Sequence, residues 1–457
     1  MMKSGMIILH DTAAGGLTPF VPGGREGGDG PGDRSVDEVK VYVCGPTVYD
    51  RSHLGHGKTF VAFDTLRRLL IHHGYTVRLV QNFTDIEDSL HRKSVELGVS
   101  EGEVAERFIE DFFSGMDRLN VLRADRYPRV SEHIDEIVET IGRLIDIGSA
   151  YISKGGVFFR AGEDEHGMLL HRALPELIVE GDRYLTELGP EARAAAAEVA
   201  CGTPVPSSGK ASPFDFAVWE RGDGVKRDWP SPWGRGRPGW HIECYVMSRK
   251  YLGLPVDIQG GGLDLVFPHH ESKTLMTRVL DGVDFSRHSL HTGFVLAGQE
   301  KMSRSVHNII TLQDAFREHS PRALRYVLAV SHYRDSFEYS PGAVDEAEAH
   351  VERLFEVAWA WDALAGEEGP CPGTREDSVA PGLPAGDLEE SYSAFFESFR
   401  NDLRTDLAEE ALNRFLEKAR DMLDAGGGSP EAARPVAAAF RQFFFLLGLD
   451  SYYTQES

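Results

Sequence analysis

Apolar and polar positions near the N-terminus follow the pattern of a strand, a turn and a helix. Apolar residues alternate with polar ones over 39–43, and Gly45 and Pro46 predict a turn directly afterwards. Apolar side chains then recur at helical spacing over 60–71, and a further strand is predicted over 76–81. Because parallel strands need a crossover connection, this order predicts a parallel sheet with a covering helix.

Breaks in the pattern divide the rest of the chain. Residues 22–36 form a glycine-rich loop before the first strand, and residues 112–235 are polar with a largely helical pattern. Prolines and glycines over 365–387 indicate a linker. Helical periodicity resumes over 388–423 and 432–449, which predicts a terminal bundle of helices.

Composition and charge narrow the class of protein. A chain of 457 residues that is 41% hydrophobic predicts about two to four domains. Four cysteines and no apolar run long enough to cross a bilayer predict a cytoplasmic protein outside the membrane. The net charge of −24 argues against extensive phosphate contacts, so RNA binding would depend on local basic residues. Candidates are Lys226, Arg227, Arg235, Arg237, Arg322 and Arg325.

A pair of histidines precedes the predicted helix. His53 and His56 stand one turn apart, where a helix start offers unpaired N–H groups and a positive dipole end to an anion. Two imidazoles there can donate hydrogen bonds to a triphosphate. Such a pair on its own is also common as two loop histidines without a role.

A second motif, Lys301-Met302-Ser303-Arg304-Ser305, follows much later in the chain. In this order, the two motifs resemble the ATP-handling motifs of class I aminoacyl-tRNA synthetases, with Arg304 in place of the second lysine. The resemblance implies an adenylate-forming ligase. It also implies an α/β fold, with a Rossmann-like parallel sheet that is split by an insertion and followed by a C-terminal helical bundle.

Three further residues indicate the substrate. Cys44 follows the first predicted strand, Cys244 lies in Trp240-His241-Ile242-Glu243-Cys244, and His269 precedes a second histidine. Here the resemblance becomes specific to the cysteinyl-tRNA synthetase family, and it implies one zinc ion held by these three residues, with an open position for the substrate thiolate. Because zinc favours thiolate and deprotonates a bound thiol, the metal would select cysteine over serine.

Lys273 departs from the pattern of that family. It stands one helical turn after His269, where the family has a glutamate ligand, and an ammonium is a poor ligand for zinc. Three alternatives stay open: the three residues above completed by substrate sulfur, a site that recruits Glu271 or His270, or no zinc. We favour the first, since three protein ligands and one open position form the ordinary catalytic arrangement.

The resemblance implies roles for other positions as well. Contacts to the substrate cysteine are implied for Thr47, Thr84 and Trp240. Contacts to ATP, which would bind with Mg²⁺, are implied for His53, His56, Gly260, Gly261, Gly262, Asp264 and Lys301. The catalytic residues implied are His53, His56, Lys301 and Arg304.

The same resemblance predicts how the chain divides into domains. The expected segments are 1–111, the first half of the catalytic domain with an N-terminal strand and the glycine-rich loop; 112–235, a connective insertion; 236–310, the second half with the lysine loop; 311–345, a segment similar to the stem-contact region; and 346–457, a helical bundle without a C-terminal anticodon domain.

The acceptor of the activated cysteine is left open. In the resembled family it is the terminal ribose of tRNA(Cys), and any RNA contact is expected at the acceptor end, near Arg322 and Arg325. The mycothiol cysteine ligase family uses a sugar amine instead, also lacks an anticodon domain, and is favoured by Gln259, whereas residues 46–49 favour the tRNA enzyme. We therefore expect activation of L-cysteine with ATP and transfer to tRNA(Cys). Alternatives are a ligase with a small amine acceptor and a non-catalytic zinc- or nucleotide-binding paralogue.

Overall fold

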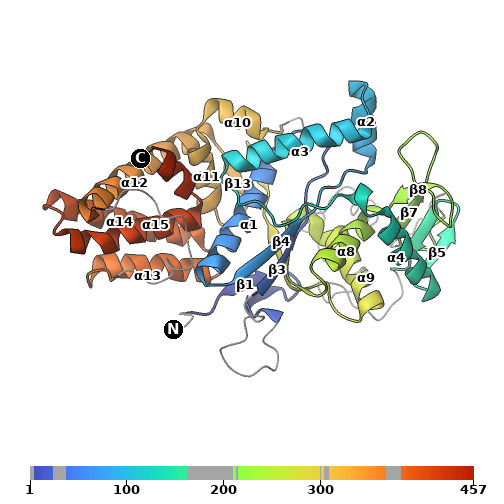
Figure 1. The fold of residues 1–457 in the computed structure, drawn as a ribbon, viewed down its shortest axis with the longest axis horizontal. Helices are drawn as coiled ribbons and strands as arrows, with labels where there is room; N and C mark the ends of the chain where they lie inside the picture. Colours follow the sequence, from blue (N-terminus) through green and yellow to red (C-terminus); the bar gives the residue numbers. More distant parts are fainter. Residues whose placement is uncertain are drawn as a thin grey trace.

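A parallel four-stranded sheet lies at the centre of the molecule (Figure 1). The structure is a computed structural model that describes residues 5–23, 38–161, 209–212, 215–298, 300–302, 308–366 and 382–456. The strand order is β10-β9-β3-β4, with bounds Ser286–Thr292, Val256–Gly262, Glu38–Val43 and Thr76–Gln81. The predicted α/β class with a parallel sheet is confirmed.

The first β–α–β unit follows directly from the sequence pattern. Helix α1 (Leu54–His72) connects β3 to β4, and its apolar residues Phe60, Phe63 and Leu66 are buried. Strand β3 pairs in parallel with β4 on one side and with β9 on the other. Because β9 comes much later in the chain, the insertion separates the two halves of one sheet.

The described part of the insertion contains a second sheet, on the right of Figure 1. Four antiparallel strands follow the order β5-β6-β7-β8, with bounds Ala150–Ser153, Gly156–Phe159, Phe216–Arg221 and Gly236–Pro238. Their apolar residues pack against helix α4 (Ile134–Asp146) in a core of their own. The largely helical prediction is therefore wrong for this described part, because β6 and β7 pair across a long stretch of chain that local periodicity does not reveal.

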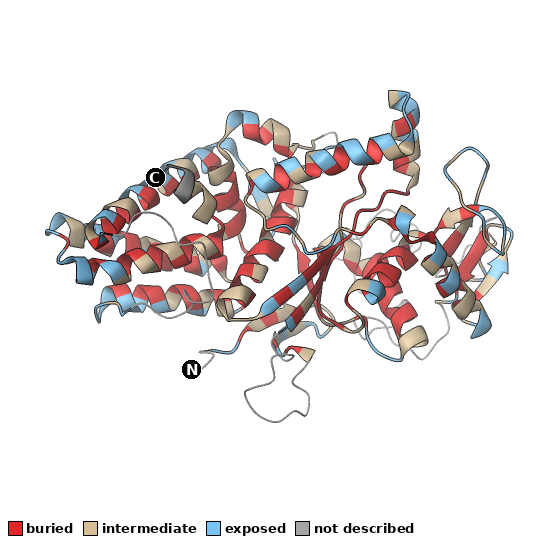
Figure 2. Ribbon diagram, in the orientation of Figure 1, coloured by how far each residue is buried: buried red, intermediate tan, exposed pale blue. Residues whose placement is uncertain are grey.

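A bundle of helices packs against α1 on the left of Figure 1. The predicted helical segment over 388–423 is two helices, because Asp402 and Leu403 adopt left-handed φ angles of 61° and 50° between them. Buried residues line the inner faces of the helices, whereas exposed residues lie on the outside (Figure 2). The helices are α10 (Leu312–Glu318), α11 (Pro321–Val330), α12 (Pro341–Ala365), α13 (Asp387–Arg400), α14 (Thr405–Asp424), α15 (Pro430–Leu447) and α16 (Asp450–Glu456).

Smaller elements complete the described fold. Two antiparallel strands, β1 (Ile8–Asp11) and β2 (Gly16–Pro19), lie beside β10. A three-stranded sheet in the order β12-β11-β13 has the bounds Glu300–Lys301, Val295–Ala297 and Phe337–Tyr339. Helices α8 (Trp240–Tyr251) and α9 (Glu271–Asp281) lie beside the central sheet, whereas α2 (Asp88–Leu97) packs against α3 (Glu101–Arg118) above it in Figure 1.

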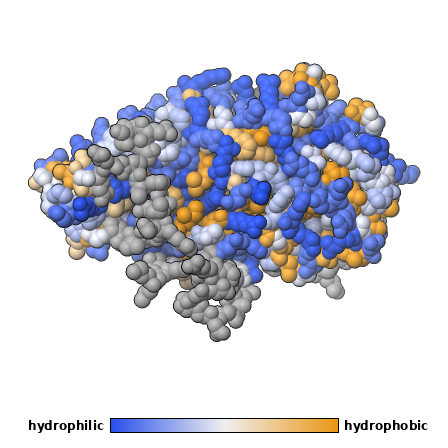
Figure 3. Space-filling view, viewed as in Figure 1, coloured by the Kyte–Doolittle hydropathy of each residue, from blue (hydrophilic) through white to orange (hydrophobic). Residues whose placement is uncertain are grey.

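The surface is mainly hydrophilic on the face drawn in Figure 3, with apolar residues gathered in small patches. Among the described helices, none combines the length and the apolar character that a membrane crossing requires.

Candidate active site

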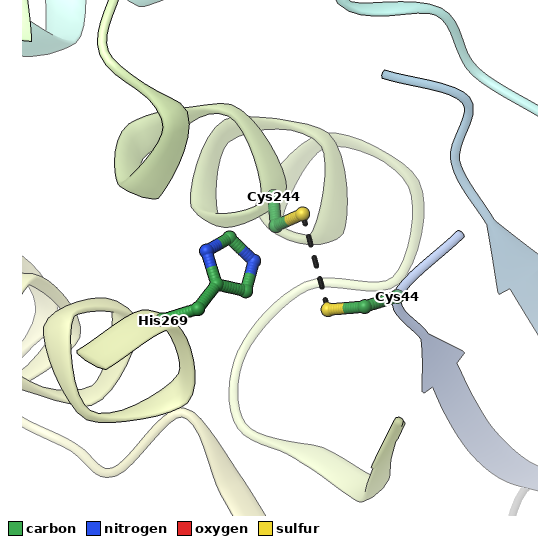
Figure 4. A group of neighbouring side chains, drawn as sticks. All are labelled: Cys44, Cys244 and His269. Atoms are coloured by element: carbon green, nitrogen blue, oxygen red, sulfur yellow. Dashed lines mark hydrogen bonds between the residues drawn. The ribbon is translucent and has the colours of Figure 1, made fainter. Parts of the chain in front are cut away.

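Three elements bring Cys44, Cys244 and His269 together beside the end of the central sheet (Figure 4). Cys44 directly follows β3, and its backbone N–H donates to Gly260 O of β9 at 3.0 Å. Cys244 lies on α8, and His269 lies in a kinked segment, Val266–His270, that leads into α9. All three are buried, and their potential ligand atoms lie within 4.8 Å of one another. The structure thus brings together residues that are far apart in the chain.

Gly45 explains how the chain turns sharply after Cys44. A Cβ atom at Gly45 would lie 1.6 Å from Asn82 O, so only glycine allows this close approach of the two backbone segments. Asn82 holds the turn from its side chain as well, because its Oδ1 atom accepts hydrogen bonds from Gly45 N and Tyr42 Oη at 3.0 Å each.

The geometry of the cluster suits a tetrahedral zinc ion. The Sγ atoms of Cys44 and Cys244 are 3.9 Å apart, close to the separation of about 3.8 Å that two Zn–S bonds of about 2.3 Å give in a tetrahedron. Two thiolates and one imidazole are also donors that zinc prefers. The three residues therefore fit a zinc site that leaves one position for another ligand.

The two cysteines differ in their electrostatic surroundings. Burial alone would raise the pKa of Cys44, but the hydrogen bond from Cys244 and the charge of Lys273 outweigh it and hold that pKa well below its usual value. The hydrogen bond donated to Cys44, together with burial, raises the pKa of Cys244 well above its usual value. Between the two thiols alone, Cys44 is therefore the one that ionises first, and a bound zinc would deprotonate Cys244 as well.

Other polar side chains lie next to Cys44, among them Lys273 and His270, the histidine named above as an alternative ligand. His270 Nε2 lies 3.3 Å from Cys44 Sγ, while its Nδ1 lies 2.7 Å from His291 Nε2. Burial and then the charge of Lys273 lower the pKa of His270 to about 4, so the ring is neutral. The repeated histidine after Pro268 was visible in the sequence, but its partner His291 was not, because it comes from β10.

The residues expected to contact the substrate cysteine lie close to this cluster. The indole of Trp240 stacks on His269, with ring centroids 4.4 Å apart. Thr47 and Thr84 form an isolated parallel bridge, and Thr84 Oγ1 accepts a hydrogen bond from Asn82 Nδ2 at 3.3 Å. Since Asn82 Oδ1 also lies 3.6 Å from Cys244 Sγ, Asn82 is a neighbour of both Thr84 and Cys244.

The two histidines of the first motif begin α1. His53 is the N-cap residue, and its Nδ1 atom accepts a hydrogen bond from His56 N at 3.3 Å. His56 Nδ1 in turn accepts from His53 N at 3.4 Å, and the two rings stack 3.8 Å apart. Both side chains are partly exposed at the positive end of the helix dipole, where an anion is stabilised.

The glycines at the end of β9 have a packing reason in addition to the expected nucleotide contact. A Cβ atom at Gly260 would lie 2.1 Å from the Phe63 ring, so this glycine lets α1 pack closely on the sheet. A Cβ atom at Gly261 would lie 2.8 Å from the Leu265 side chain. Asp264 follows on the next turn with an exposed side chain, at the carboxyl end of a parallel strand where ligands commonly bind.

The lysine motif is described only in part. The backbone of Lys301 pairs with Leu296 in the hairpin of β11 and β12. Nothing is described of the Lys301 side chain, and Arg304 lies outside the described residues. The expected phosphate contacts of these two residues therefore stay predictions.

Five of the six candidate basic residues for RNA binding form ion pairs with acidic partners, whereas the Arg227 guanidinium lies over the Trp229 ring. Arg325 is fully buried and pairs with Asp64 at 2.7 Å, so the prediction that it contacts RNA is wrong. It was named as a candidate because it is basic, and the sequence does not reveal that its partner Asp64 comes from a distant helix. The other ion pairs are Arg322 with Glu348 and Glu352, Arg235 with Asp228, Arg237 with Asp88 and Glu220, and Lys226 with Asp88.

Comparison with known proteins agrees with this geometry. Residues 33–349 match the family described as tRNA synthetases class I (C) catalytic domain. A cysteine–tRNA ligase from Thermococcus onnurineus is 41% identical over 339 residues, which are 71% of this chain and 67% of that protein. A cysteine–tRNA ligase from Caldicellulosiruptor saccharolyticus is 36% identical over 419 residues, which are 91% of this chain and 84% of that protein.

Other matches show how far the similarity extends. A cysteine–tRNA ligase from Pyrococcus furiosus is 44% identical over 304 residues, which are 66% of this chain but only 59% of that protein. The solved structure of Mycobacterium tuberculosis methionyl-tRNA synthetase in complex with methionyl-adenylate has a TM-score of 0.60 at 15% identity and covers 92% of this chain and 91% of that one, a likeness of fold alone. The chain therefore belongs to the cysteinyl-tRNA synthetase family of class I aminoacyl-tRNA synthetases.

Proposed function

We propose that this protein activates L-cysteine with ATP and transfers the cysteinyl group to tRNA(Cys). The observation that carries the proposal is the buried cluster of Cys44, Cys244 and His269 at the end of a class I synthetase sheet. A thiolate-rich site with one open ligand position is suited to a substrate that brings its own thiol.

Cys44, Cys244 and His269 would hold a zinc ion. When bound, zinc would supply a Lewis acid that deprotonates and holds the thiol of substrate cysteine. The protein orients the ligands around it, since Trp240 stacks on His269 and Asn82 contacts Cys244. Serine offers only a hard, weakly acidic hydroxyl, so this donor set disfavours it.

The ATP site would lie at the N-terminus of α1. His53 and His56, with the helix dipole behind them, would stabilise charge on the phosphates as the cysteine carboxylate attacks the α-phosphate and pyrophosphate leaves. Mg²⁺ would accompany the phosphates, and Lys301 and Arg304 would approach them from the lysine loop. Gly260–Gly262 and Asp264 would contact the nucleoside at the end of β9.

Substrate cysteine would be positioned by Thr47, Thr84 and Trp240. Once the adenylate has formed, a terminal ribose hydroxyl of tRNA attacks its carbonyl carbon and AMP leaves. The mixed anhydride is already activated, so no nucleophile from the protein is needed. Because tRNA is charged where translation occurs, we place this activity in the cytoplasm.

A small amine is the second candidate acceptor. It is favoured by Gln259, which is fully buried and whose Oε1 atom has no hydrogen-bond partner among the described residues. The pairing of five of the six basic candidates with acidic residues also favours an acceptor that is smaller than a whole tRNA.

Transfer of labelled cysteine tests the choice of acceptor. Protein incubated with ATP and labelled cysteine should acylate tRNA(Cys), and this product should be lost on mild alkaline hydrolysis as an ester is. An alkali-stable product formed with an amino sugar, and none with tRNA, would replace the proposal with the small-amine ligase. If neither transfer of cysteine nor formation of the adenylate is detected, the protein would instead be the non-catalytic paralogue.

A further inference from the structure

Lys273 is a buried cation beside the thiol cluster. It lies on α9, one helical turn after His269, and its side chain has no exposed surface. Its Nζ atom lies 3.2 Å from Cys44 Sγ. It also lies 4.3 Å from the centre of the Phe285 ring and 5.4 Å from that of Tyr42.

The partners of Lys273 are unusual for a buried lysine. Among the described residues, its only side-chain hydrogen-bond partner is Cys44, and no carboxylate lies within ion-pair distance of it. A buried ammonium loses several kcal/mol of hydration unless an opposite charge compensates it. The aromatic rings compensate part of this loss, since their faces attract cations. The remaining compensation must come from negative charge on sulfur.

The formal charges of the site with zinc and substrate cysteine bound indicate which negative charge Lys273 can compensate. A zinc ion with the thiolates of Cys44, Cys244 and substrate cysteine has a summed formal charge of −1, because one divalent cation faces three anions. Lys273 adds one positive charge and brings the sum to zero. With serine bound as a neutral hydroxyl, the same site would carry a surplus positive charge.

We propose that Lys273 is a specificity-determining residue that balances the third thiolate when substrate cysteine binds. This inference rests on the proposed function and deepens it, because it assigns the preference for a thiolate to a protein cation as well as to the metal. Lys273 acts through charge at short range and through its hold on Cys44. It does not need to touch the reacting carboxylate or ATP.

The test is to remove the charge of Lys273 and measure cysteine binding directly. Lys273→Met keeps the length of the side chain, and Lys273→Gln keeps a hydrogen-bond donor without the charge. The matched control is Lys250→Met on α8, a lysine whose side chain is 41% exposed and which pairs with Glu136. Zinc per chain is measured by metal analysis, and cysteine binding by the thiolate-to-metal absorption band of the cobalt-substituted protein.

Both Lys273 variants should keep their zinc and lose cysteine affinity by about tenfold to a hundredfold, the effect of one unit charge at a few ångströms in a partly shielded site. Serine, measured as a competitor, should bind each variant as weakly as it binds the unmodified protein. Lys250→Met should change neither affinity. Unchanged cysteine affinity in both Lys273 variants, or equal losses for cysteine and serine, would overturn the proposal.

A second measurement uses the unmodified protein and does not depend on how well a variant folds. Calorimetric titrations in buffers of different ionisation enthalpy should count about one proton released per cysteine bound, since the thiol enters as thiolate. Binding without proton release would overturn the charge balance. Cysteine-dependent exchange of pyrophosphate into ATP is measured in parallel. If exchange occurs but Lys273→Met does not change cysteine affinity, only this inference is refuted. If Lys273→Met weakens cysteine binding but no exchange occurs, only the proposed function is refuted.

Discussion

Replacing Arg325 with methionine should destabilise the protein strongly without removing a ligand of the cysteine site. The Arg325 side chain is fully buried on α11. Its Nη2 atom forms an ion pair with Asp64 of α1 at 2.7 Å, although without an aligned hydrogen bond. Its Nε and Nη1 atoms donate to Leu447 O at 2.7 Å and to Leu119 O at 3.3 Å. These contacts join the helix of the histidine motif to the end of α15.

The size of the effect follows from what the substitution leaves unpaired. Removing one partner of a buried ion pair costs about 3–5 kcal/mol, because the other charge remains buried. Arg68 still pairs with Asp64 at 2.7 Å, so the loss should lie near the lower value, about 3 kcal/mol. For a domain of the size of the bundle with its partner helix, this corresponds to a fall in melting temperature of about 6–12 °C.

Scanning calorimetry of the purified variant measures this fall. Arg317→Met on α10 is the control, because the Arg317 side chain is 70% exposed and its ion pair with Asp314 should contribute at most about 1 kcal/mol. Zinc content should be the same in both variants and in the unmodified protein. If Arg325→Met melts within about 2 °C of the unmodified protein and instead weakens RNA binding, the arginine faces RNA and the reasoning fails.

Three further predictions address the metal, the acceptor and the electrostatics of α1. Cys244→Ser should lose both zinc and cysteine activation, and full activity in a metal-free preparation would contradict the zinc proposal. A minihelix that carries only the acceptor stem should be charged nearly as well as whole tRNA(Cys), with a salt dependence of about two to four phosphate contacts; strong dependence on the anticodon would contradict this. Burial lowers the pKa of Lys58 from 10.5 to about 8, so between these values the unfolded chain binds a proton that the folded protein does not, and stability rises with pH. Lys58→Met removes this pH-dependent contribution. From pH 7 to above pH 10, the unmodified protein should therefore gain stability over the variant by about 3 kcal/mol, measured as a growing difference in melting temperature. A difference in melting temperature that stays constant with pH would contradict this prediction.

Local patterns were sufficient to predict the first β–α–β unit of the central sheet, whereas the split of that sheet by an insertion was expected only from the family resemblance. Alternation over 39–43 and helical spacing over 60–71 correspond to β3 and α1, because both elements bury one face against a neighbour close in the chain. The sheet β5-β6-β7-β8 was not predicted, since its strands pair across a long stretch of chain. The left-handed residues Asp402 and Leu403, which divide α13 from α14, also gave no signal in the periodicity.

The candidate site shows the same division. Cys44, Cys244 and His269 could be assembled from the sequence because their flanking residues resemble one family, and the structure places them together. Lys273 could be recognised as a departure, but its lack of a carboxylate partner depends on packing that only the fold specifies. For the same reason, Arg325 resembled a surface cation until its partner on another helix was known.

Exchange of labelled pyrophosphate into ATP is the most direct test of cysteine activation by this protein. We expect exchange that depends on cysteine, is absent with serine, disappears after zinc is removed and returns when zinc is added back. Exchange that is equal with serine, that persists without metal, or that does not occur with cysteine at all would contradict this expectation.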